Sequence, residues 1–85
     1  MKKNVIKIEY KLNSNEVNQS LLQLFNEFGF IATDHVAIQQ EDNISKAMLL
    51  LWKIKEETSL FEAMEYCWLT AGSSKENILK EFGYE

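Results

Sequence analysis

Arginine and proline are both absent from this 85-residue chain, and cysteine and histidine each occur once. A single cysteine excludes an internal disulfide, so a reducing compartment is expected. Sequence-specific DNA-binding proteins depend on arginine for bidentate guanine contacts and on a basic surface for phosphates. Because the chain has nine lysines, thirteen acidic residues and a net charge of −4, it is not expected to bind nucleic acid by itself.

Patterns typical of catalysis and metal binding are also missing. Metal sites need several ligands at set spacings, and nucleophilic catalysis needs a nucleophile, a base and an orienting group close together. His35 and Cys67 have no partner of their own type, so both are interpreted as structural. The adjacent acids Glu41–Asp42 and Glu56–Glu57 are interpreted as helix-end and surface residues. We therefore expect a non-enzymatic protein without catalytic residues, metal or cofactor.

No stretch resembles a signal peptide or a membrane span. Lysine and glutamate interrupt the N-terminal segment, so the apolar core of a signal peptide is missing. The longest apolar run, from Ala47 to Trp52, is much shorter than the ~20 residues that cross a bilayer. The length fits one domain. We expect a single cytoplasmic domain over residues 1–85.

The N-terminal part of the chain predicts a strand followed by a helix. Residues 4–12 alternate apolar and charged side chains, which is the pattern of a half-buried strand. Two outward lysines suit an edge strand. A capping box, apolar residues at helical spacing and Gly29 as a stop predict a helix over 14–28.

Residues 30–41 are compatible with either a strand or a short helix. Val36 and Ile38 alternate with their neighbours, and the first strand needs a hydrogen-bonding partner. We therefore favour a second, short strand at 35–39, parallel to the first in a β-α-β unit. Because a two-stranded sheet is thin, a homodimer through the N-terminal strand is the alternative.

A central helix is predicted over 44–57, with Asp42 or Asn43 as its N-cap. Its apolar residues cover an arc of about 200° at about 100° per residue. An arc that wide implies packing on two sides. Leu49 falls outside this arc, on the polar side of the helix.

Two further helices are predicted in the C-terminal third. Ser59 and Glu62 form a capping box for a helix over 60–71. A short last helix follows, with inward residues Ile78, Leu79 and Phe82. The predicted fold class is therefore α+β with the helical part dominant: an N-terminal strand, a helix, a second short strand and then three helices.

The same segment resembles a known family over about twenty residues. Residues 59–63 (Ser-Leu-Phe-Glu-Ala), then Tyr66-Cys67 and a capped short helix, are similar to the helical segment of the phage late-transcription coactivators. The resemblance implies a segment that docks on RNA polymerase. The acidic and apolar tail with which that family engages a sliding clamp has no counterpart here, where the printed sequence ends Phe-Gly-Tyr-Glu.

A protein-binding patch is predicted on the helix over 60–71. Tyr66 and Leu69 are neighbours at i, i+3 on its outer side, next to two glutamates. An aromatic and an aliphatic anchor with a charged rim are typical of a binding hot spot. The candidate residues are Glu62, Glu65, Tyr66, Leu69 and Leu49. Whether this patch is exposed or covered by a neighbouring segment stays open.

These features predict a small binding module, an adaptor or inhibitor of a larger cytosolic protein. Its acidic helical surface would favour a partner with a basic or mixed surface. The arginine-free, lysine- and isoleucine-rich composition is the reason to expect a phage or mobile-element gene. The alternative is a transcription regulator or coactivator, active as a dimer, that binds RNA polymerase or DNA through the two C-terminal helices, whose proportions are those of a helix-turn-helix.

Overall fold

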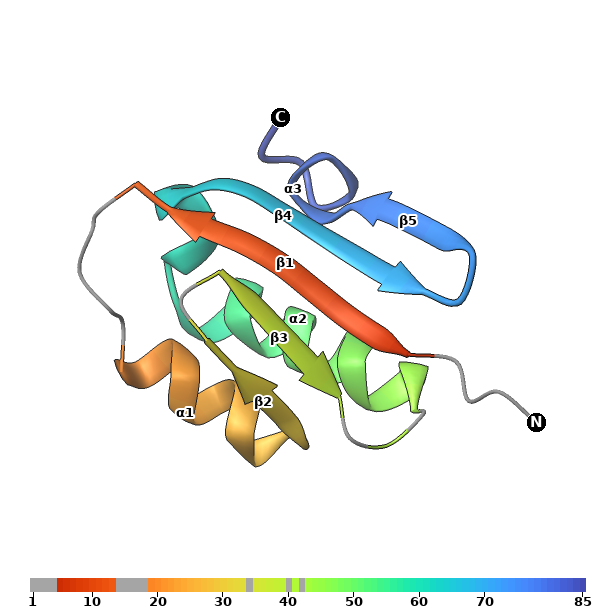
Figure 1. Ribbon diagram of the computed structural model, residues 1–85. Coiled ribbons are helices and arrows are strands. Elements are labelled where there is room, and N and C mark those ends of the chain that lie inside the picture. The colour runs from red at the N-terminus through yellow and green to blue at the C-terminus, as the bar shows by residue number, and fades with distance from the viewer. Residues whose placement is uncertain (1–4, 14–18, 34, 40, 42) are drawn as a thin grey trace.

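A computed structural model describes residues 5–13, 19–33, 35–39, 41 and 43–85 (Figure 1). The elements of these described residues, in chain order, are β1 (Ile6–Leu12), α1 (Gln19–Glu27), β2 (Phe30–Ala32), β3 (Val36–Gln39), α2 (Ile44–Glu57), the 3-10 helix η1 (Leu60–Ala63), β4 (Met64–Ala71), β5 (Ser74–Asn77) and α3 (Ile78–Glu81).

The described strands form one antiparallel sheet in the order β2-β3-β1-β4-β5. The elements from β1 to β4 follow the order of the ferredoxin-like, split β-α-β arrangement. The unit is split because β3 lies between the mutually parallel strands β1 and β2. A two-residue turn then adds β5, and Gly72 at its first position has the positive φ of 61° that a type II′ turn requires.

The helices cover one face of this sheet. Alternate residues of β1 point into the core, where the ring of Tyr10 lies 5.2 Å from that of Phe25 in α1. On the same side, the ring of Trp52 in α2 lies 5.3 Å from that of Phe82, which follows α3. In Figure 1, α2 lies behind β1 and β3. No described element crosses the opposite face of the sheet, which we call the open face.

Two of the predicted elements are confirmed. The strand predicted over 4–12 is β1, and the helix predicted over 44–57 is α2 with the same bounds. Asn43 is the N-cap of α2, since its side-chain oxygen accepts a hydrogen bond of 3.0 Å from the Lys46 N–H. The capping box predicted for the helix over 14–28 includes a residue outside the described part of the chain, which contains α1 from Gln19 onward.

The prediction of a thin parallel sheet is wrong. A strand at Val36–Gln39 is confirmed, but β3 pairs antiparallel with β1, and β2 was not predicted. The physical reason is Gly29, whose φ of 81° lets the chain turn directly from α1 into β2. β2 therefore runs parallel to β1, which is the direction that was predicted for the strand at 35–39. β1 is also not an edge strand, because β3 and β4 occupy its two hydrogen-bonding edges.

The prediction that helices dominate the C-terminal third is wrong as well. The residues predicted as a helix over 60–71 form η1 and β4, and β5 occupies the start of the predicted last helix. The 3-10 helix and a bulge opposite β1 place the buried residues Phe61, Met64 and Cys67 at intervals of three, which imitates a helix. Strand alternation becomes visible only with Leu69. The final helix is a single turn, with Ile78 and Leu79 buried as predicted.

α2 does not pack on two sides. Its fully buried residues form one stripe toward the sheet, while Ile44 and Trp52 are each almost half exposed. Both had been assigned to the buried arc. Leu49, which falls outside that arc, is the most exposed large apolar residue of the helix.

Candidate functional site

The five predicted protein-binding residues do not form one surface. Tyr66 and Leu69 lie three residues apart on a strand, so their side chains point to opposite faces of the sheet. Leu69 is 5% exposed and belongs to the core, whereas Tyr66 is half-buried on the open face. The predicted hot spot depended on helical spacing and is not assembled.

The other three predicted residues are dispersed. Glu62 is exposed in η1, and Glu65 at the β-bulge forms an ion pair of 3.2 Å with Lys11. Leu49 is 62% exposed on α2, on the helical side of the sheet. Tyr66 and Leu49 therefore lie on opposite sides of the molecule.

The open face is instead a grid of side chains from all the described strands. Residues directly opposite one another form rows across the sheet. The first row is Ile31, Ile38, Lys7, Thr70 and Lys75, and the second is Val36, Glu9, Trp68 and Asn77. Lys11 and Tyr66 begin a third row.

An aliphatic cluster lies at the β2 end of this grid. Ile31 and Ile38 face each other across β2 and β3 and are 59% and 43% exposed. Val36 lies on the same face, two residues from Ile38. An uncovered sheet face usually carries polar side chains, so a cross-strand pair of exposed isoleucines makes this end a candidate contact surface.

Two aromatic rings lie toward the opposite end of the grid. Tyr66 and Trp68 are alternate residues of β4 and so project from the same face, about 7 Å apart along the strand. Lys75 of β5 holds its ammonium group 5.1 Å from the centre of the Trp68 ring. Both residues are half-buried.

Each lysine of the open face has a partner on that face. Lys7 pairs with Glu9 at 3.6 Å, Lys11 pairs with Glu65 at 3.2 Å, and Lys75 lies over Trp68. Three lysines and two glutamates give this face a net charge of about +1. By contrast, the described residues outside the face carry four lysines and eight glutamates. Within the described residues, the open face is thus less acidic than the rest.

Cys67 and His35, the single cysteine and histidine, lie outside the aliphatic and aromatic groups of the open face. Cys67 is buried in the core, and desolvation raises the pKa of its thiol from 9.0 to about 12, so it stays protonated and unreactive. His35 is exposed, and its carbonyl accepts the Tyr10 N–H at 2.9 Å. Within the described residues, no three His, Cys, Asp or Glu side chains gather as a metal site would require.

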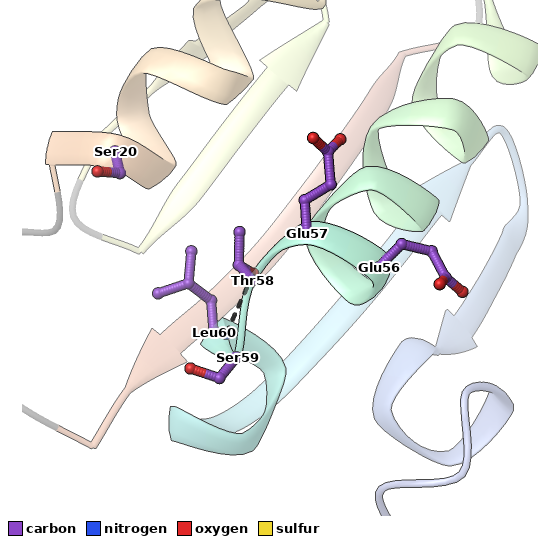
Figure 2. Close-up of a pocket in the computed structure, with 6 residues that line it drawn as sticks. All are labelled: Ser20, Glu56, Glu57, Thr58, Ser59 and Leu60. Atoms are coloured by element: carbon purple, nitrogen blue, oxygen red, sulfur yellow. Dashed lines mark hydrogen bonds between the residues drawn. The ribbon is translucent and has the colours of Figure 1, made fainter.

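An open pocket of about 590 Å³ lies where the end of α2 meets η1 and the start of α1 (Figure 2). It is lined by Ser20, Glu56, Glu57, Thr58, Ser59 and Leu60. Figure 2 shows Glu57 pointing toward α1 and Glu56 turning away, so these adjacent carboxylates diverge. The Thr58 hydroxyl is used locally, because it donates to the Ile54 carbonyl and accepts the Leu60 N–H at 3.2 Å. This arrangement ends a helix and does not converge on a ligand.

Comparison of the chain with protein-family models, with curated proteins and with solved structures finds no match in any of the three. The segment that resembles the late-transcription coactivators is a strand from Met64 onward, so the helical docking element implied by that resemblance is not formed. Among the described residues, no helix has the length and apolar content needed to span a bilayer. The candidate site therefore depends on geometry alone.

Sequence reasoning missed two of the apolar residues that make the open face, Ile31 and Trp68. Ile31 belongs to an unpredicted strand, and Trp68 was assigned to a helix core. A signal was present in the segment Tyr-Cys-Trp-Leu-Thr, which is rich in strand-favouring residues. Its alternation places Tyr66, Trp68 and Thr70 on one face.

Proposed function

We propose that this chain is a non-enzymatic binding module that docks on a larger protein through its open face. The observation that supports this most directly is one-sided coverage. The helices pack on one face of the sheet, while the other face carries an exposed aliphatic pair and two half-buried aromatic residues. Burying apolar surface contributes about 25 cal/mol per Å², so a partner that covers this face gains binding energy without rearranging the domain.

The composition of the face indicates the chemistry of the partner. Ile31 and Ile38 at one end, and Trp68 at the other, are anchors of the kind that dominate binding energy. The paired charges of β1 between them favour a partner surface that is apolar with isolated charges of both signs. The acidic helical layer contributes a long-range field that speeds encounter with a basic protein. An adaptor or inhibitor would work in this way, by occupying a surface of its target.

A second candidate function is supported by the aromatic pair. Tyr66 and Trp68 on an open antiparallel sheet could stack nucleobases, as sheet-based single-strand binders do. Such binders also need a basic surface, and here the three lysines of the face already have partners. We therefore favour a protein partner. The DNA-binding alternative with two C-terminal helices loses its basis, because Met64–Ala71 is a strand.

The test is a matched pair of variants. Ile38→Glu places a charge on the open face, and Leu49→Glu places the same charge on the exposed side of α2. With a tagged protein in an extract of its native host, we expect a specific protein to be captured by the wild type and Leu49→Glu, but not by Ile38→Glu. Far-ultraviolet circular dichroism should be the same for all three proteins. Capture that survives Ile38→Glu and is lost with Leu49→Glu would move the docking surface to the helical side.

The same variants separate protein binding from nucleic-acid binding. A fluorescently labelled oligothymidine should show no change in anisotropy with the wild-type protein at low salt, where phosphate contacts are strongest. Binding that is lost in Trp68→Ala would instead favour the nucleic-acid function. The cytosolic location and the phage or mobile-element origin remain part of this proposal, on the composition alone.

A further inference from the structure

The two edges of the sheet differ in how they are protected against pairing. β5 carries Lys75 and Glu76, and such charges discourage the addition of another strand. β2 carries no charge, and its central residue Ile31 is strongly exposed. The described part of the chain places β3 on one side of β2 and no strand on the other.

The register shows which backbone groups of β2 face outward. The Thr33 N–H donates to the Val36 carbonyl at 2.7 Å. Hydrogen-bonded pairs recur at every second residue of an antiparallel ladder, so Ile31 is bonded to Ile38. The N–H and C=O groups of Phe30 and Ala32 therefore point away from β3, toward the edge.

The helix beside this edge is also uncharged on its outer flank. One flank of α1 lines a pocket together with Lys53 and Glu57 of α2. At about 100° per residue, the opposite flank consists of Gln19, Leu22 and Asn26. In Figure 1, α1 lies at the β2 side of the molecule. Its flank opposite the pocket carries no charged residue.

We propose that two copies of this chain pair antiparallel through β2, about a twofold axis at Ile31. Phe30 of one copy then hydrogen-bonds with Ala32 of the other in both directions, which satisfies the outward backbone groups. The two Ile31 side chains become neighbours and, with the adjacent Ile38 residues, form a continuous apolar row. The α1 flanks meet on the helical side. The result is one ten-stranded sheet with the open face doubled.

Charge is the reason that the occupant is a second copy. A twofold axis brings each residue close to its own equivalent, so a charged edge would repel itself there. The β2 edge and the outer flank of α1 contain no charge that would do so. At the β5 edge, the same operation would bring like charges of Lys75 and Glu76 together. This inference does not depend on the docking of a larger protein on the open face.

Sedimentation equilibrium of the wild type and two lysine variants tests the proposal. The wild type is expected at twice the 9.9 kDa of one chain. Ile31→Lys places like charges at the axis and should raise the dimer dissociation constant by about 100-fold or more. Ile38→Lys alters the same face one strand further in and should stay dimeric. A wild type with the mass of one chain at all concentrations, or a dimer unaffected by Ile31→Lys, would overturn the pairing.

A cysteine pair provides an independent readout that avoids placing a charge in the strand. Residues on the axis would form a non-hydrogen-bonded pair, with Cα atoms about 4.5 Å apart, within reach of a disulfide. Ile31→Cys should therefore give a covalent dimer on mild oxidation. Ile38→Cys is one strand further from the axis in each copy, about 14 Å from its equivalent, and should not. Cys67 is buried and does not compete. Cross-linking at position 38 but not at 31 would contradict this interface.

Discussion

The two faces of the sheet are made by the same strands, yet they differ in what their residues do. On the covered face, polar groups are bonded inside the protein: the Tyr10 hydroxyl donates to the Thr33 carbonyl, and the Gln39 amide bonds both backbone groups of Asn43 at 2.8 Å. On the open face, Ile31 and Ile38 contact solvent. The covered face accounts for the stability of the domain. Because the apolar residues of the open face are exposed or only half-buried, they are expected to contribute less to that stability, which is consistent with the proposed binding role.

The contrast is sharpest along β4, where consecutive residues alternate between the two faces. Leu69 is buried against the helical layer and Thr70 lies on the open face. Leu69→Ala should lower the free energy of unfolding by about 2–5 kcal/mol, because it removes buried methyl groups and leaves a cavity. Thr70→Ala, the matched control, should change it by less than about 1 kcal/mol. Chemical denaturation measures both. Equal effects would show that the two faces do not differ in packing.

Cys67 tests how well the covered face excludes water. Burial raises the pKa of its thiol to about 12, whereas the unfolded chain loses this proton above about 9.0. Between these values the unfolded state binds fewer protons, so the free energy of unfolding falls as pH rises, by on the order of 1 kcal/mol per pH unit. Below pH 9 the thiol contributes no pH dependence.

Cys67→Ala is the control for this pH dependence, because it removes the thiol and leaves all other side chains unchanged. The fall in unfolding free energy from pH 9 to 11 should be steeper for the wild type than for Cys67→Ala. A thiol reagent should also modify native Cys67 slowly and unfolded Cys67 at once. Rapid modification of the folded protein would mean that the covered face admits solvent.

The smallest change in the free energy of unfolding is expected for a substitution that alters the open face without adding a charge. Ile38→Thr keeps a β-branched side chain on β3 and should change the free energy of unfolding by about 0.5 kcal/mol or less. It should nevertheless weaken capture of the partner protein, because it removes apolar contact area. A loss of several kcal/mol in stability would show that Ile38 belongs to the core and would remove it from the docking surface.

Local sequence patterns predicted some elements correctly and gave the wrong secondary structure for others. β1 and α2 were predictable, since strict alternation and an asparagine cap act within a few residues of the chain. The segment from Phe61 to Leu69 was not, because a 3-10 turn, a bulge and a strand together produce the spacing of a helix. Pairing with β1 makes this segment a strand and not a helix. That pairing joins residues more than fifty positions apart in the sequence.

The candidate site was less predictable than the fold. Tyr66 was selected for an exposed patch and lies on the open face, but Leu69 was selected beside it and is buried. The error has one cause: residues at i and i+3 are neighbours on a helix and face opposite ways on a strand. Ile31 and Trp68 could not be assigned to one surface until the strand order was known.

The sequence by itself determined the charge balance, the lack of a metal-binding or catalytic motif, the alternation of β1 and the bounds of α2. The tertiary structure alone decided which side of each strand is covered. Alternation divides a strand into two faces, but it does not say over which face the helices pack. That choice depends on the order of strands and on the direction in which each helix crosses the sheet, and it leaves Ile31, Ile38 and Trp68 together on the open face.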